Sequence, residues 1–117
     1  MNAKNLYYYK AKVDRVIDGD TVDVIFDLGF GISLANRVRL AEIDTPEMRT
    51  RDLKEKEAGL SAYVFTKAWL DSVNGDIFIE TTLDKAGKYG RVIGKIFNAN
   101  GDCLNDALLK FGHAEEY

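Results

Sequence analysis

Alternating apolar and polar residues dominate the first half of the chain, and this pattern restricts the possible folds more than any other sequence feature. Residues 22–28 read Val-Asp-Val-Ile-Phe-Asp-Leu, so that alternate positions are apolar. Successive side chains of a strand point to opposite faces, and such alternation is therefore typical of a sheet with one buried face. Residues 7–16 and 32–43 are also rich in β-branched, aromatic and alternating residues. We therefore expect three strands before residue 44.

The second half changes period. Five apolar residues recur at helical spacing, namely Ala58, Ala62, Phe65, Trp69 and Val73. The charged residues 47–57 lack this periodicity and are expected to form a loop, and Asn-Gly at 74–75 is expected to end the helix. Residues 77–82 and 91–97 alternate as strands, and residues 104–111 favour a short helix.

This order of elements predicts a mainly β fold with α-helices. Five strands, one longer helix after the third strand and a short C-terminal helix suit a five-stranded OB-fold barrel. A mixed open sheet is the alternative that the pattern leaves open. The 117 residues are a usual length for one domain, so residues 1–117 are expected to form a single domain.

Composition excludes several classes of protein. Sixteen basic and 19 acidic residues give a net charge of −3, which argues against binding a polyanion by general electrostatic attraction. The single Cys103 excludes an internal disulfide and a cysteine-rich metal site. No run reaches the roughly 20 apolar residues of a membrane span, and we expect no membrane association. The first residues lack an apolar leader core, which predicts a cytoplasmic location if the chain is complete.

Two acidic motifs lie at the ends of predicted strands. Asp-Gly-Asp at residues 18–20 marks a turn, where carboxylate oxygens suit a hard cation such as calcium or magnesium. Arg-Leu-Ala-Glu-Ile-Asp-Thr-Pro-Glu spans residues 39–47 and contains Pro46, the only proline of the chain. This proline stiffens the backbone between Asp44 and Glu47. Each motif alone also fits a solvated turn or strand end.

A third motif, Lys-Tyr-Gly-Arg at residues 88–91, precedes the last predicted strand. The planar guanidinium of Arg91 matches phosphate oxygens, although a tight turn with a solvated arginine is the simpler interpretation. The three motifs in this order resemble those of the staphylococcal nuclease family, and the resemblance covers roughly residues 9–114. It implies an OB-fold barrel and a calcium-dependent phosphodiesterase that cleaves DNA and RNA and leaves 3′-phosphates.

The resemblance also implies roles for individual residues. The carboxylates of Asp20 and Asp44 and the carbonyl of Thr45 match the calcium ligands. Glu47 matches the general base or the group that orients water, and Arg39 and Arg91 match the phosphate-binding arginines.

Other positions match less central parts of the family site. Lys88 and Tyr89 match positions near the terminal phosphate of the nucleotide, and Asp18 is expected beside the metal ligands. The segment between Thr21 and Arg39 is longer than in the best-known member, which predicts a different hairpin over the site. Tyr117 is expected to be a frayed end.

Three functions remain to be distinguished. An active nuclease, acting as a monomer with a preference for single-stranded DNA and RNA, is favoured because the acidic and arginine positions are all present. A noncatalytic module of the same fold that binds nucleic acid or protein is the first alternative. An adaptor whose acidic surface binds a protein partner is the second, and it predicts no metal dependence.

Overall fold

The computed structural model describes residues 7–83 and 92–117. The first three strands are β1 (Tyr8–Asp18), β2 (Thr21–Asp27) and β3 (Ser33–Leu40). A two-residue strand β4 (Ile43–Asp44) precedes the helix α1 (Leu53–Ser72). The chain continues with β5 (Asp76–Leu83), β6 (Val92–Phe97), the helix α2 (Leu104–Lys110) and a short strand β7 (Glu115–Glu116).

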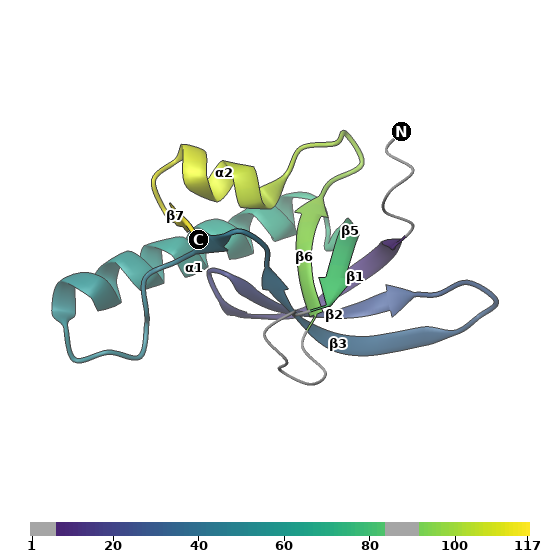
Figure 1. Ribbon diagram of the computed structural model, residues 1–117, viewed down its shortest axis with the longest axis horizontal. Helices are drawn as coiled ribbons and strands as arrows, with labels where there is room; N and C mark the ends of the chain where they lie inside the picture. Colours follow the sequence, from purple (N-terminus) through teal and green to yellow (C-terminus); the bar gives the residue numbers. More distant parts are fainter. Residues whose placement is uncertain (1–6, 84–91) are drawn as a thin grey trace.

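Five strands close into a barrel in the order β1-β2-β3-β6-β5, which confirms the predicted barrel and excludes the open sheet. All neighbouring strands of the barrel are antiparallel except β3 and β6, which run parallel. Both helices lie on one side of the barrel, whereas the β2–β3 hairpin extends away from them (Figure 1). No helix within the described ranges is long and apolar enough to cross a membrane.

The alternating apolar residues in the first half of the chain line the interior of the barrel, as expected. Val22, Val24 and Phe26 of β2 are buried, and Val38 and Leu40 of β3 join them in the core. Burying side chains of this size stabilises a fold by about 1.5–3 kcal/mol each. The same alternation places Arg39 on the outer face of the barrel, between two buried neighbours.

The third strand is shorter than predicted. Residues 32–43 were expected to be continuous, but β3 ends at Leu40 and a turn follows. Glu42 adopts a left-handed backbone with φ of 64° and its side chain is exposed, so it does not continue the buried face. The chain then reverses into β4, which pairs with β7. The sequence did not predict either of these two-residue strands.

The long helix begins earlier than predicted. Leu53 is its first residue, so the second half of the expected 47–57 loop is helical, and Ala58 is exposed rather than buried. Asp52 caps this end, because its carboxylate accepts hydrogen bonds from the N–H groups of Lys54 and Glu55. Asp followed three residues later by Glu is a known helix-start pattern. This pattern could have identified the start of α1 from the sequence.

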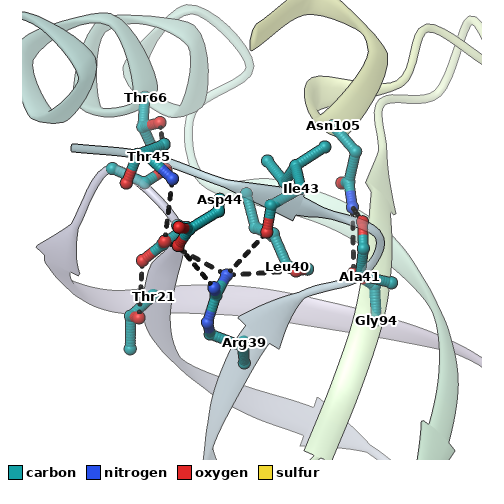
Figure 2. Close-up of polar contacts among 12 residues, drawn as sticks. Thr21, Arg39, Leu40, Ala41, Ile43, Asp44, Thr45, Thr66, Gly94 and Asn105 are labelled. Carbon is teal, nitrogen blue, oxygen red and sulfur yellow. Dashed lines mark hydrogen bonds and ion pairs between the residues drawn. The ribbon is translucent and has the colours of Figure 1, made fainter. Parts of the chain in front are cut away.

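The short helix α2 is joined to the barrel through one buried amide. Asn105 is 2% exposed, and its Nδ2 donates to the carbonyls of Ala41 (3.0 Å) and Gly94 (3.2 Å). Its Oδ1 accepts from the N–H of Ile96 at 3.2 Å. These bonds connect α2 with β6 and with the turn that follows β3 (Figure 2). The turn that leads to β4 is therefore fixed from the side of α2.

Cys103 precedes α2, and burial raises the pKa of its thiol. A raised pKa means that less thiolate is present at a given pH, and the thiolate is the nucleophile. We expect iodoacetamide to modify Cys103 in the folded protein with a pH midpoint above that of the urea-unfolded chain. Mass spectrometry of both samples between pH 7 and 10 measures this difference. Coincident midpoints would contradict it.

Candidate active site

The first part of the site is the turn between β1 and β2. Asp20 is only 8% exposed, although it carries a carboxylate. Its Oδ1 accepts from the hydroxyl of Thr21 at 3.1 Å, and its Oδ2 accepts from the N–H of Thr45 at 3.2 Å. The turn therefore holds a nearly buried carboxylate at the point where β2 begins.

Helix α1 packs against this turn. A side chain at Gly19 would collide with the helix, because an added Cβ would lie 2.8 Å from the Cβ of Ala62. The hydroxyl of the buried Thr66 donates to the carbonyl of Gly19 at 2.7 Å. Glycine at position 19 thus permits the close approach, and Thr66 fixes it.

Replacing Thr66 by valine is expected to lower the free energy of unfolding by about 1–3 kcal/mol. Valine keeps the shape of threonine but leaves the carbonyl of Gly19 without this buried donor. Urea unfolding measures the loss, with Thr82→Val on the exposed face of β5 as the matched control. Equal effects of the two substitutions would show that the hydrogen bond to Gly19 contributes nothing.

The second part of the site is Arg39, the last outward-facing residue of β3. Its Nη1 lies 3.1 Å from Oδ2 of Asp20, and its Nη2 lies 3.0 Å from Oδ1 of Asp44. Nη1 also donates to the carbonyls of Leu40 (3.3 Å) and Ile43 (3.1 Å). Figure 2 shows the guanidinium of Arg39 joined by dashed lines to Asp44 and to the backbone oxygens of Leu40 and Ile43. One cationic group therefore bridges two acids from different elements.

This bridge shows that the carboxylates of Asp20 and Asp44 point toward one location. Asp20 is nearly buried, whereas the side chain of Asp44 is 54% exposed. Thr45 follows Asp44 and is buried. The structure thus brings together four residues that the sequence predicted as site residues, namely Asp20, Arg39, Asp44 and Thr45.

Glu47 lies outside this cluster of contacts, in the segment between β4 and α1. It is exposed, and no hydrogen bond or ion pair to its carboxylate occurs within the described part of the chain. Its N–H donates to Oε2 of Glu55 at 3.3 Å. Arg49, two residues later, donates to Asp18 at 3.2 Å and so links this segment to the β1–β2 turn. Glu47 thus has an exposed carboxylate in a segment that follows Asp44 in sequence and that Arg49 links to Asp18.

The C-terminal strand adds a contact that the sequence did not predict. Strand β7 pairs with β4, with Glu115 opposite Asp44. The N–H of Tyr117 donates to the carbonyl of Glu42 at 3.0 Å, and its ring centre lies 5.9 Å from the Arg39 guanidinium. The expectation of a frayed end at Tyr117 was therefore wrong. A ring over a cation at this distance is a favourable contact.

Lys88, Tyr89 and Arg91 fall outside the described residues. The long hairpin between Thr21 and Arg39 does not cover the site, because this pair lies at the base of the hairpin and its tip at the far end (Figure 1).

Arg37, two residues before Arg39 on the same face of β3, does not join the site. It forms an ion pair with Asp23 at 2.8 Å. This hydrogen bond lowers the pKa of Asp23 and raises that of Arg37. Arg37 therefore provides a neighbouring arginine with a different partner.

The oxygen atoms of these residues determine which cation could bind at the site. Within the described ranges, no three His, Cys, Asp or Glu side chains gather as a metal cluster. Calcium accepts six to eight oxygen ligands, including carboxylates, backbone carbonyls and water, in loose geometry. Two convergent carboxylates fit such an ion, provided that backbone and water oxygens complete its shell.

A family model described as "Staphylococcal nuclease homologue" matches residues 37–117. An uncharacterised protein of Methanocaldococcus jannaschii is 33% identical over 94% of the chain, which spans 60% of that protein. The thermonuclease of Staphylococcus intermedius is 33% identical over 87% of the chain, which spans 56% of it. Endonuclease YhcR of Bacillus subtilis is 28% identical over 93% of the chain, which spans 9% of it. The chain thus spans less than two thirds of each relative.

Proposed function

Since the chain belongs to the staphylococcal nuclease homologue family, we propose that it is a calcium-dependent nuclease acting on DNA and RNA. We take residues 1–117 as its single catalytic domain. The observation that carries the proposal is the bridge in which Arg39 joins Asp20 and Asp44. Such a group of two carboxylates and a guanidinium suits phosphodiester chemistry, which needs a cation and a donor for phosphate oxygens.

Asp20, Asp44 and the carbonyl of Thr45 would hold the calcium ion. The convergence of the two carboxylates on one guanidinium supports this assignment, since one cation already interacts with both. The ion, when bound, polarises the phosphoryl group and holds a water molecule for attack. Glu115 lies opposite Asp44 on β7 and adds negative charge beside the same location.

Glu47 is proposed to accept a proton from the attacking water. The water oxygen forms a bond to phosphorus, the P–O5′ bond breaks, and the leaving oxygen takes a proton from solvent. This route gives a 3′-phosphate, as the family resemblance implies. The carboxylate of Glu47 is exposed and has no described partner, so it is available to a substrate-bound water.

Arg39 is proposed to bind the phosphoryl oxygens as negative charge grows on them. Two carbonyls and two carboxylates hold its guanidinium beside the acidic pair, where the phosphate would bind. Arg91 is proposed as the second phosphate-binding arginine, with Lys88 and Tyr89 at the terminal phosphate. These three assignments rest on the resemblance alone.

The deciding experiment measures breakdown of single-stranded DNA and RNA with calcium and then with excess chelator. We expect hydrolysis only with calcium, and products that a phosphatase converts to 3′-hydroxyl ends. Binding without hydrolysis under both conditions would instead support the noncatalytic module of the same fold. An absence of both binding and hydrolysis would support the adaptor function.

We further propose a monomer that prefers single-stranded substrate and binds it through few phosphates. The net charge of −3 supports this, because positive charge near the substrate is then local. Few neutralised phosphates give a shallow dependence of affinity on salt concentration. Fluorescence anisotropy of a labelled oligonucleotide in a chelator-treated sample, repeated at several salt concentrations, measures that slope.

A further inference from the structure

Four residues on one face of α1 contact the two segments that carry the site. They follow the helical spacing i, i+4, i+7 and i+11, and they are Glu55, Gly59, Ala62 and Thr66. Ala62 and Thr66 contact Gly19, the neighbour of Asp20. Gly59 and Glu55 contact the backbone at Pro46 and Glu47. A single helix face therefore determines the spacing between the two segments.

The side chain of Glu55 does not form the hydrogen bond that is common at its position in a helix. An acid three residues after a helix cap often accepts a hydrogen bond from the N–H of the capping residue. Here the N–H of Asp52 donates to the hydroxyl of Thr50 at 3.3 Å. Oε2 of Glu55 instead accepts from the N–H of Glu47 at 3.3 Å. The Glu55 side chain thus orients the backbone of Glu47.

Gly59 allows the same segment to approach the helix. An added Cβ would lie 2.6 Å from the carbonyl oxygen of Glu47 and 2.7 Å from that of Pro46. Those distances are far shorter than any van der Waals contact, so a larger residue would push the segment away from α1. The N–H of Glu47 is therefore bonded to Glu55, and the lack of a side chain at Gly59 leaves room for the carbonyl of Glu47 beside α1.

We propose that Glu55 and Gly59 are positioning residues that hold Glu47 in place for proton transfer. This inference rests on the proposed function of Glu47. Misplacement of a reacting group by about 1 Å can cost on the order of a hundredfold in rate. Glu55 forms no hydrogen bond or ion pair with Asp20, Asp44 or Arg39, so we infer that its influence on turnover passes through Glu47.

The test compares Glu55→Ala and Glu55→Gln with Glu57→Ala. Glu57 is an exposed acid on the next part of α1 with no hydrogen bond or ion pair to another described residue, and its loss changes the net charge equally. We expect Glu55→Ala to lower kcat about tenfold or more with little change in KM, whereas Glu57→Ala has no effect. Glu55→Gln keeps an oxygen that accepts the Glu47 N–H and is expected to retain most activity.

Hydrogen exchange of the Glu47 amide gives a readout that does not depend on catalysis. We expect faster exchange in Glu55→Ala than in Glu57→Ala. The double variant Glu47→Gln/Glu55→Ala is expected to be no slower than Glu47→Gln. An additive loss in the double variant would overturn the proposal, because Glu55 would then act through another group.

Two further results would overturn the inference in distinguishable ways. If Glu47→Gln is slow but Glu55→Ala matches Glu57→Ala in kcat and amide exchange, only the positioning role fails. If Glu47→Gln turns over at the wild-type rate, the proposed function of Glu47 fails and the positioning role with it. Gly59→Ala serves as a second variant, with its folding checked by circular dichroism, and unchanged kcat in that folded variant also counts against the proposal.

Discussion

Replacing Arg39 by glutamine is expected to lower turnover about a hundredfold or more, because the guanidinium meets charge that grows in the transition state. Arg39→Lys is expected to restore only part of this loss. Lysine keeps the charge but has one nitrogen, whereas Arg39 reaches Asp20 and Asp44 through two different nitrogens. Steady-state kinetics at saturating calcium measures both variants.

Arg37→Gln is the matched control for this experiment. Arg37 lies on the same face of β3, two residues away, but it pairs with Asp23 instead of the site. We expect its turnover to stay near the wild-type value. Equal rates in Arg37→Gln and folded Arg39→Gln would remove Arg39 from the mechanism.

Calcium is expected to raise the free energy of unfolding by about 2.7 kcal/mol at a concentration one hundred times its dissociation constant. The expectation follows from binding to the folded state alone, since Asp20 and Asp44 converge only there. Asp20→Asn combined with Asp44→Asn should abolish the increase. Melting curves recorded from zero to millimolar calcium measure the shift.

Arg39 modifies this expectation in a testable way. Its guanidinium already balances the two carboxylates. Arg39→Gln is therefore expected to be less stable than the wild type without calcium, and calcium is expected to stabilise it more.

A double variant of two exposed acids, Asp71→Asn with Asp76→Asn, controls for the change in net charge in Asp20→Asn/Asp44→Asn. A calcium shift that persists in Asp20→Asn/Asp44→Asn but disappears in this control would place the ion elsewhere.

The sequence predicted those parts of the fold that depend on local periodicity. Val22, Val24 and Phe26 alternate in the sequence and line the core in the structure, because a strand with one buried face imposes that pattern. The longer helix was found but its start was missed. Two polar residues, Asp52 and Glu55, mark the start of the helix, and residues 53–57 do not extend its apolar stripe.

The site was predictable only in part. The motifs identified Asp20, Arg39, Asp44 and Thr45, and the structure brings these residues together. The supporting contacts were not predictable, because they join distant parts of the chain. Thr66 bonds the carbonyl of Gly19, and Tyr117 lies over Arg39 through pairing of β7 with β4. No local pattern encodes such pairs, since the first depends on how α1 packs on the β1–β2 turn and the second on a sheet outside the barrel.

The β2–β3 hairpin places its tip and the site residue Arg39 at opposite ends. Its base pairs Thr21 with Arg39, and its last pair is Asp27 with Ser33, beyond which Phe30 projects fully into solvent. Adding one residue to each strand at the tip lengthens the hairpin but leaves every pair below it unchanged. Adding a residue to one strand alone would instead leave one residue unpaired as a β-bulge. The tip is therefore the natural place for a spectroscopic label or an affinity tag, inserted without disturbing the acids and the arginine at the other end.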